Sequence, residues 1–266
     1  MQTKKISAAE VLTNWPYPAA DSDKYARGVV GFDTGSRRYP GAALLGVIGA
    51  LYAGAGMIRY LGEVDPELIL TRTPSATIGP GRVDALVVGS GWDAQDEQHL
   101  AERIAQDVPM VVDAGALEFL APLQARDVIL PSNSLLTPHA GELAKLLDID
   151  RCEVQADPLS HAQLAAARFH CCVLIKGAQQ FCVDPSGSAL QAVAGLAWTG
   201  QAGSGDVLAG VCGTLLAAGL PALQAGAYAA SIQAMAARRR PGPFPPDVMA
   251  SVIAELLGEI QLTAGD

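Results

Sequence analysis

Charged and aromatic residues are scarce in this 266-residue chain: Asp, Glu, Lys and Arg make up 17% of it, and Phe, Trp and Tyr make up 5%. An ordinary soluble domain carries roughly 25% charged residues. Hydrophobic residues reach 50%, which excludes a disordered or fibrous chain, because such chains lack the apolar residues that build a core. The interior must therefore consist largely of alanine, glycine, leucine and valine, a composition that suits helices packed closely on a sheet.

Basic residues are also fewer than acidic residues. Lys and Arg total 18 against 27 Asp and Glu, which gives a formal net charge of −9 at pH 7. Non-specific nucleic-acid binding depends on cations that contact phosphates, so we expect no nucleic-acid partner. A small anionic ligand is compatible with this charge, because helix N-termini and backbone N–H groups can hold an anion without net positive charge.

The five cysteines are odd in number and form no CxxC pair, so the sequence indicates neither a disulfide framework nor a zinc site. Lys4 and Lys5 are followed by Ser7-Ala8-Ala9-Glu10, a capping box that predicts a short helix, and not by the apolar core of a signal peptide. We therefore expect a cytoplasmic protein. The cysteines are Cys152, Cys171, Cys172, Cys182 and Cys212.

One uncharged segment, 41–58, is long enough to suggest a membrane span. It contains five glycines and many alanines, so its hydrophobic strength favours a buried helix, with Pro40 at the helix start. A second uncharged run, 207–237, is interrupted by Gly219-Leu220-Pro221 and predicts two buried helices. We expect no membrane contact.

Short apolar segments alternate with helical patterns, which predicts parallel βαβ units in a three-layer α/β/α sandwich. Segments 181–184 and 189–193 flank Pro185-Ser186-Gly187 and predict an antiparallel hairpin at one end of the sheet. No repeat or low-complexity linker divides the sequence, so we expect one domain over residues 1–266. The predicted parallel strands are 28–32, 56–60, 85–89, 110–113, 135–137 and 171–176, and the predicted helices are 42–53, 95–106, 116–120, 141–147, 159–170, 206–218, 222–237 and 247–259.

Ligands of open α/β sheets bind beyond the carboxyl ends of the strands, so we expect the functional residues in loops that follow strands and precede helices. Gly203, Ser204 and Gly205 come directly before an apolar helix and predict an anion hole for a phosphate. Asp206 falls in the first turn of that helix, beside the expected phosphate. The alternative interpretation is a plain loop with an ordinary N-terminal acid.

A second such loop is Thr137-Pro138-His139-Ala140-Gly141-Glu142, in which Pro138 forces an extended exit from a strand. Glu142 falls in the first turn of the following helix. It is a candidate for a hydrated Mg²⁺ ion, which prefers oxygen ligands, and His139 is a candidate hydrogen-bonding group of the cleft. The alternative is a capped helix with a surface histidine.

Two further strand ends carry weaker signals. Lys176-Gly177-Ala178 follows a buried strand and suits phosphate or ribose oxygens, although a strand-end lysine that reaches solvent is an equally simple interpretation. Gly89-Ser90-Gly91 lets a ligand approach the backbone. The sequence has no GxxxxGK[ST] phosphate loop, and position 94 is Ala where a dinucleotide fingerprint needs its third glycine.

Taken in this order, the segments resemble the ribokinase-like superfamily and, within it, the ADP- or ATP-dependent NAD(P)H-hydrate dehydratase family. The similarity runs from about residue 25 to residue 240. Its most specific part is the His-x-Gly-Glu form of the second loop, because sugar and vitamin kinases of the superfamily usually carry Asn at the position of His139. The other matching segments are Tyr39-Pro40-Gly41-Ala42-Ala43, Gly54-Ala55-Gly56, Asp113-Ala114-Gly115-Ala116-Leu117 and Gly203-Ser204-Gly205-Asp206-Val207-Leu208-Ala209-Gly210.

The resemblance implies a ribokinase-like fold and a carbon–oxygen lyase that repairs damaged NADH and NADPH. Such an enzyme dehydrates the S form of NADH hydrate or NADPH hydrate, consumes ADP or ATP and releases phosphate, with Asp206 as the catalytic base. The implied substrate-binding residues are Ala42, Gly89, Gly91, His139 and Asp206, and the implied nucleotide-binding residues are Lys176, Gly177, Ala178, Gln179, Gln180 and Gly205.

Three positions depart from the family pattern. Gln180 stands where Thr is usual, Gln201-Ala202 replaces Thr-Gly, and Gly115 replaces the second Asp of Asp-Ala-Asp-Ala-Leu. The leading alternative function is a kinase of the same superfamily, acting on a hydroxymethylpyrimidine, a thiazole or a sugar alcohol with the same Asp206. A nucleotide-binding regulator without catalysis is a third possibility, which the intact Gly-Ser-Gly-Asp turn disfavours.

The resemblance also implies partners. The chain looks like prokaryotic members that use ADP, so we expect ADP rather than ATP as the co-substrate, together with Mg²⁺. The family suggests a homotetramer. The nucleotide-binding domain takes up the length of the chain, so we expect the companion NAD(P)H-hydrate epimerase to be a separate protein or absent.

Overall fold

The computed structural model describes residues 3–263, and the side chains of residues 3–259. Within this range ten strands form one sheet in the order β1-β10-β9-β8-β7-β6-β5-β2-β3-β4. Strand β9 is antiparallel to both of its neighbours, whereas the other pairs are parallel. The strands are β1 (Lys4–Lys5), β2 (Val29–Asp33), β3 (Met57–Tyr60), β4 (Thr77–Ile78), β5 (Ala85–Val88), β6 (Met110–Val112), β7 (Leu135–Leu136), β8 (Cys172–Ile175), β9 (Phe181–Val183) and β10 (Ala189–Gln191).

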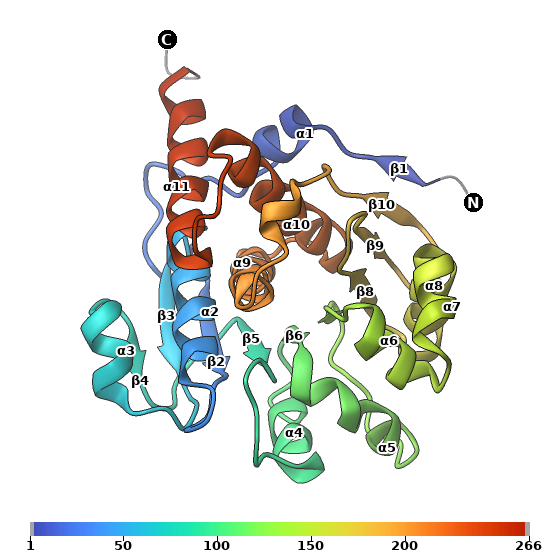
Figure 1. Cartoon of the computed structure of the whole chain (residues 1–266). Coiled ribbons are helices and arrows are strands. Elements are labelled where there is room, and N and C mark those ends of the chain that lie inside the picture. Colours follow the sequence, from blue (N-terminus) through green and yellow to red (C-terminus); the bar gives the residue numbers. More distant parts are fainter. Residues whose placement is uncertain (1–2, 264–266) are drawn as a thin grey trace.

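Helices cover both faces of this sheet (Figure 1). Successive residues of the central strands point to opposite sides, so that Val87 joins one hydrophobic cluster while Leu86 and Val88 join the other. The helices are α1 (Ala8–Thr13), α2 (Pro40–Tyr52), α3 (Pro66–Arg72), α4 (Glu97–Ile104), η1 (Ala114–Phe119), α5 (Leu120–Gln124), α6 (Ala140–Leu147), α7 (Arg151–Ala156), α8 (Pro158–Phe169), η2 (Ala197–Thr199), α9 (Ser204–Ala217), α10 (Ala222–Arg239) and α11 (Pro246–Thr263), where η1 and η2 are 3₁₀ helices.

The first face carries α2, α9, α10 and α11, and the second carries α4 to α8. These layers confirm the expected three-layer sandwich, and the β9–β10 pair is the antiparallel hairpin that the sequence predicts. Figure 1 looks nearly along α9, which lies at the centre of the molecule.

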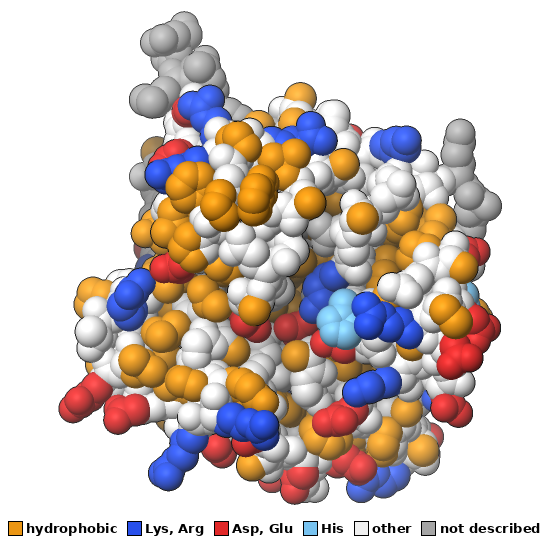
Figure 2. Space-filling model, in the orientation of Figure 1, with side chains coloured by type: hydrophobic (Ala, Val, Ile, Leu, Met, Phe, Trp, Pro, Cys, Tyr) orange, Lys and Arg blue, Asp and Glu red, His pale blue; other side chains and the backbone are white. Residues whose placement is uncertain are grey.

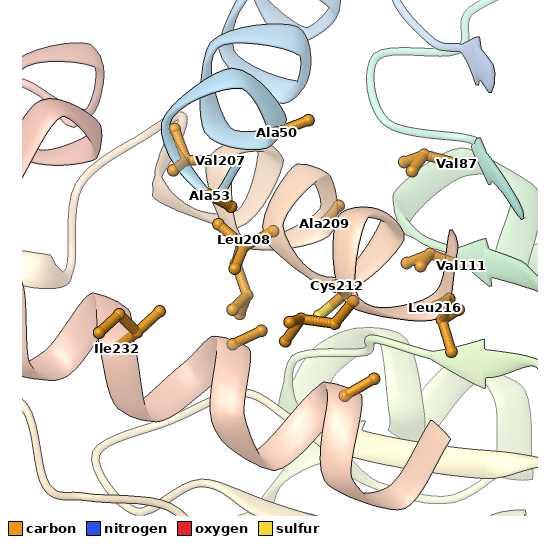
Figure 3. Packing of buried hydrophobic residues seen from close by; sticks show 14 of the residues in the cluster. Ala50, Ala53, Val87, Val111, Val207, Leu208, Ala209, Cys212, Leu216 and Ile232 are labelled. Atoms are coloured by element: carbon orange, nitrogen blue, oxygen red, sulfur yellow. The ribbon is translucent and has the colours of Figure 1, made fainter. Parts of the chain in front are cut away.

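Helix α9 packs unusually close to α2. A side-chain carbon at Gly210 would collide with the backbone carbonyl of Gly46, so only glycine permits this approach. Figure 3 shows α9 surrounded by small and branched side chains, with Ala50 of α2 on one side and Ile232 of α10 on another. The close contact sets two helix N-termini next to each other at the carboxyl edge of the sheet.

Several predicted boundaries need correction. The helix expected at 116–120 is a 3₁₀ helix, η1, followed by α5. Five short elements are not among the predicted strands and helices: β1, α3, β4, α7 and η2. In the predicted capping box, Ser7 Oγ accepts the Glu10 N–H at 3.1 Å, but the Glu10 carboxylate accepts a hydrogen bond from Lys4 Nζ at 2.7 Å instead of reaching back to residue 7.

The uncharged segment 41–58 supplies most of α2 and the beginning of β3. Between residues 3 and 263, no helix combines the length and the apolar character that crossing a membrane requires. The second uncharged run forms α9 and α10, as expected, with the break between Ala217 and Ala222.

Candidate active site

A buried carboxylate lies where the carboxyl ends of β5 to β8 meet. Asp113 directly follows β6 and is only 2% exposed. Its Oδ1 accepts hydrogen bonds from Lys176 Nζ at 2.7 Å and Thr137 Oγ1 at 2.8 Å, and its Oδ2 accepts one from Ser90 Oγ at 2.8 Å. These three donors satisfy a charge that would otherwise be costly to bury. Asp113 therefore connects the three loops that follow β5, β7 and β8.

The predicted anion-hole turn lies at the N-terminus of α9. Gly203 adopts a left-handed conformation with φ of 90°, which favours glycine. The Ser204 N–H donates to the Gln201 carbonyl at 3.2 Å, so it is not a free donor in this structure. Among the described residues of this turn, the N–H groups of Gly203, Gly205 and Asp206 have no hydrogen-bond partner, and the last two lie in the first turn of α9, where a helix N-terminus offers donors to an anion.

Asp206 occupies the first turn of α9, as the sequence predicts. Burial raises the pKa of its carboxyl group from 3.8 to about 7, with the negative charge of Asp113 adding to the effect and the Lys176 ammonium opposing it. A carboxyl group with a pKa near the working pH is suited to act as a general base. The structure therefore gives Asp206 a chemistry that an ordinary helix-capping acid lacks.

Lys176 reaches the same point from the end of β8. Burial alone lowers the pKa of this lysine, but the carboxylates of Asp113 and Glu142 more than compensate, so that its pKa is raised and the ammonium form is retained. Its Nζ lies 3.7 Å from Glu142 Oε2. The cation thus lies between two carboxylates and beside the N-terminus of α9, where its Nζ is 3.6 Å from the Cβ position of Gly205.

His139 is the N-cap of α6. Its Nδ1 accepts the N–H groups of Gly141 at 3.0 Å and Glu142 at 3.1 Å, while Glu142 Oε2 accepts the His139 N–H at 2.7 Å. These bonds form a complete capping box. Because Nδ1 is an acceptor, the neutral ring carries its proton on Nε2, and the side chain remains 59% exposed. The capping role and the expected ligand role therefore use different nitrogens of one ring.

The Gly89-Ser90-Gly91 turn lies against the N-terminal half of α2. Gly91 has φ of 71°, and a Cβ placed there would stand 2.6 Å from the Cβ of Ala42. Gly89 packs so closely on Asp113 that a side chain would collide with the Asp113 carbonyl. The structure thus brings the predicted substrate residues Ala42, Gly89 and Gly91 together, beside the carboxylate that holds Lys176.

A cavity of about 390 Å³ lies in front of α9. Lys176, Gly177, Gln180, Gly205 and His139 line it, together with Thr199, Gly200, Gln201, Ser204, Leu208 and Gln233. Two predicted nucleotide residues, Ala178 and Gln179, are exposed and are not among these lining residues. An adjoining apolar pocket is formed by Trp198, Val207, Phe244, Met249 and neighbouring residues of η2, α9, α10 and α11.

The candidate metal residue Glu142 lies in the first turn of α6, as predicted. Within the described part of the chain, no group of three or more His, Cys, Asp and Glu side chains is arranged to hold a metal ion. Mg²⁺ usually keeps several waters and binds one or two carboxylates together with substrate phosphates. The single carboxylate of Glu142 fits an ion of this kind.

Two residues of the site have no role predicted from the sequence. Asp113 is noted only as part of a matching segment, although its place directly after a strand is the same signal that identifies Lys176. Gln233, on α10, donates from Nε2 to the Ser204 carbonyl at 2.8 Å and so supports the anion-hole turn. No sequence pattern near Gln233 predicts this contact, because it depends on how α10 packs on α9.

Comparison with solved structures gives the class of the fold. A ribokinase-like superfamily protein from Enterococcus faecalis V583 matches with a TM-score of 0.84 and 20% identity over 97% of this chain and 96% of its own. The ADP/ATP-dependent NAD(P)H-hydrate dehydratase from Bacillus subtilis, co-crystallized with ATP/Mg²⁺, matches with a TM-score of 0.88 and 22% identity over 97% and 99%. The chain therefore has a ribokinase-like fold.

Sequence comparison gives the family. A family model described as NAD(P)H-hydrate dehydratase matches residues 30–255. The bifunctional NAD(P)H-hydrate repair enzyme Nnr of Mycobacterium leprae is 40% identical over 90% of this chain and 52% of its own length. The ADP-dependent (S)-NAD(P)H-hydrate dehydratase of Xanthomonas campestris is 32% identical over 90% and 89%. The chain belongs to the NAD(P)H-hydrate dehydratase family, and it spans about half the length of the first of these relatives.

Proposed function

We propose that this protein dehydrates the S forms of NADH hydrate and NADPH hydrate in a reaction that consumes ADP and releases phosphate. Membership of the family supports this proposal, and so does similarity to the ADP-dependent (S)-NAD(P)H-hydrate dehydratase of Xanthomonas campestris, 89% of which the chain covers. The observation that carries the mechanism is the position of Asp206, a carboxyl group with a pKa of about 7 beside two free backbone N–H groups.

In the first step Asp206 accepts the proton of the hydroxyl group on the hydrated nicotinamide ring. The hydroxyl oxygen then bonds to the terminal phosphorus of ADP, and the bond from that phosphorus to the bridging oxygen breaks, which releases AMP. A positioned base of this kind contributes roughly 10²- to 10⁴-fold to the rate. The N–H groups of Gly205 and Asp206 and the Lys176 ammonium stabilise the negative charge of the transferring phosphoryl group.

In the second step the phosphorylated ring loses its phosphate. Phosphate is a better leaving group than hydroxide, so the lone pair of the ring nitrogen expels it, and loss of a proton from the adjacent carbon restores the dihydronicotinamide. The products are NADH or NADPH, AMP and inorganic phosphate. The protein has to hold the ring so that phosphate, and no other group, leaves it.

The nucleotide is proposed to occupy the 390 Å³ cavity, with its phosphates at Lys176 and Gly205. Mg²⁺ bound with the nucleotide supplies further charge neutralisation, and Glu142 is the residue proposed to hold it through water. Ala178 and Gln179 contribute, in this proposal, only through the backbone of the loop they belong to.

A small-molecule kinase remains the second candidate, because Asp206, Lys176 and the α9 turn would serve either reaction. The experiment that separates them is incubation of the purified protein with NADH hydrate, ADP and Mg²⁺, followed by absorbance of the restored dihydronicotinamide. Recovery of absorbance with one phosphate released per NADH supports the dehydratase. Accumulation of a stable phosphorylated product, with no recovery of absorbance, would establish a kinase instead.

We also propose a cytoplasmic location, a homotetrameric state and a functional link to a separate NAD(P)H-hydrate epimerase. The five described cysteines are all free, and Cys171, Cys172, Cys182 and Cys212 are buried, which suits a reducing compartment. The tetramer and the epimerase link follow from the family resemblance alone. Light scattering of the purified protein and a coupled assay with the R form of the hydrate test them.

A further inference from the structure

A second cavity adjoins the site on the far side of His139. It has a volume of about 880 Å³ and lies between η1 and α5 on one side and α6 and the start of α7 on the other. Small-molecule sites span roughly 300–1,000 Å³, so this cavity is large enough for a sizeable ligand. His139 lines both this cavity and the nucleotide cavity.

Two cations of this cavity have no partner. Lys145 lies one helical turn after Gly141 on the same face of α6, and the side chain of Arg151 passes over Gly141, with its Cδ 3.9 Å from the Cβ position of that glycine. Both side chains are exposed, and neither takes part in an ion pair or hydrogen bond within residues 3–259. Figure 2 shows Lys and Arg side chains beside a histidine at the central hollow of this face.

Carboxylates lie on the rim of the same cavity. Glu118 of η1, Glu142 in the first turn of α6 and Asp148 at the C-terminus of α6 line it. A bare phosphate would be repelled by them, whereas a nucleotide offers ribose hydroxyl groups that carboxylates accept hydrogen bonds from. The mixture of unpaired cations and carboxylates therefore suits a ligand with both phosphates and sugar hydroxyls.

One wall of the cavity is joined by a backbone hydrogen bond to the turn that holds predicted substrate residues. Gly115 lines the cavity, and the Gly115 N–H donates to the Gly89 carbonyl at 3.2 Å. Gly89 is two residues from Gly91, which packs on Ala42. The cavity and this turn are therefore neighbours, and His139, another predicted substrate residue, lines the cavity itself.

We propose that the cavity between η1–α5 and α6–α7 binds the ADP-ribose half of NAD(P)H hydrate, with Arg151 and Lys145 contacting its two phosphates. This inference rests on the proposed function and adds to it a site for the non-reacting half of the substrate. The two nucleotide substrates then lie on opposite sides of His139 and use different cations, so that both can be bound when the ring hydroxyl meets the terminal phosphate.

The test compares NADH hydrate with the hydrate of reduced nicotinamide mononucleotide, which lacks the adenosine monophosphate part and with it one of the two phosphates. Arg151→Ala, Lys145→Ala and the double variant are assayed at saturating ADP. Loss of a charge-assisted hydrogen bond is expected to raise the KM for NADH hydrate roughly tenfold in each single variant, with kcat and the KM for ADP unchanged. The KM for the mononucleotide hydrate is expected to rise much less. Lys5→Ala, which removes an exposed cation of β1, is the matched control.

The outcomes separate this inference from the function on which it rests. An NADH hydrate KM within twofold of wild type in the double variant overturns the assignment of the cavity, and so does an equal rise for both hydrates. Calorimetric titration of NADH hydrate without ADP measures the same contacts in the absence of turnover. If wild type binds the hydrate but never restores NADH, the proposed function fails, and the double variant's dissociation constant still decides whether the cavity holds the ADP-ribose half.

Discussion

The two faces of the sheet are packed differently, and the difference accounts for the arrangement of the site. On the face of α2 and α9, the described buried alanines outnumber the leucines, and the two helices meet at Gly46 and Gly210. On the face of α4 to α8, the described buried leucines outnumber the alanines. A cavity of about 880 Å³ lies between η1–α5 and α6–α7. The first packing fixes two helix N-termini, whereas the second leaves room for a ligand.

On the first face, small residues let two helices approach closely and so fix the positions of their N-termini. On the second face, the helices leave a cavity between them. The N-terminus of α9 carries Asp206 and the free N–H groups, and that of α2 carries Ala42. An error of about 1 Å in such a position can cost a hundredfold in rate. We therefore expect changes on the close-packed face to affect turnover or stability, and changes around the open cavity to affect substrate binding.

The largest expected effect belongs to Asp206→Asn. Asn is nearly isosteric and is still compatible with a helix start, but it cannot accept a proton at neutral pH. We expect kcat to fall roughly 10²- to 10⁴-fold with KM little changed, the pattern of an interaction made mainly in the transition state. The matched control is Asp247→Asn, since Asp247 is also an acid in the first turn of a helix, α11. More than a tenth of wild-type turnover in Asp206→Asn would show that the proposed mechanism is wrong.

The pH dependence follows from the same group. Because the base acts as a carboxylate and its pKa is raised to about 7, kcat/KM should rise with pH up to about 7 and then level off. Stability runs the other way: a raised folded-state pKa favours the folded protein below the unfolded value of 3.8, and this contribution is lost as pH rises through about 7. The Tm of Asp206→Asn minus that of wild type should therefore increase from pH 5 to pH 8. A Tm difference that stays the same over this range would contradict the raised pKa.

Lys176→Ala separates the two ligands. The lysine lines only the nucleotide cavity, so we expect the KM for ADP to rise roughly 10- to 100-fold, as for a lost charge-assisted hydrogen bond, with a much smaller change for the hydrate. Removing the cation also leaves Asp113 buried with two neutral donors, so Lys176→Met, which preserves the apolar stem, is measured beside it. Equal losses of affinity for both ligands by calorimetry would contradict the separation of the two cavities.

Gly210→Ala tests the close-packed face directly. The added methyl group has to push against the Gly46 carbonyl, so we expect the free energy of unfolding to fall by about 1–3 kcal/mol and kcat to fall with it, as α2 and α9 separate. Gly258→Ala is the matched control, because Gly258 also lies in a helix but its Cβ position has nothing within 4 Å. That variant should gain up to about 1 kcal/mol. Equal Tm values for the two variants would refute the role assigned to the α2–α9 contact.

The difference between the faces also separates what can be read in the sequence from what cannot. The six central parallel strands and the position of the turn before Asp206 follow from local patterns of apolar residues and glycines, and the sequence predicts where they lie. The hydrogen bonds to Asp113 and the one from Gln233 join segments that are distant in the sequence, so no local pattern predicts them. The short helix α7, which places Arg151 over Gly141, has too few turns for its apolar periodicity to show. The cations of the open cavity therefore could not be assigned before the fold was known.

The smallest expected effect, and the finest test of the open side, is His139→Asn. Asn is a good N-cap, so it can replace Nδ1 as acceptor of the Gly141 and Glu142 N–H groups, and Tm should stay within a degree or two of wild type. It lacks the Nε2–H donor, which the capping bonds do not use and which lies 3.5 Å from Glu142 Oε1. Loss of one neutral hydrogen bond corresponds to roughly a 2- to 12-fold rise in the KM for the hydrate, with the KM for ADP unchanged.

His139→Ala, measured with it, removes the cap as well and should lower the free energy of unfolding by about 1 kcal/mol. The pair of variants therefore assigns each nitrogen its own role: stability follows Nδ1, and hydrate affinity follows Nε2. If Asn leaves the hydrate KM unchanged and Ala lowers only the stability, the histidine is a helix cap and nothing more. The residue that distinguishes this loop from the Asn-bearing kinases would then give no support to hydrate recognition, and the open cavity would have to supply all of it.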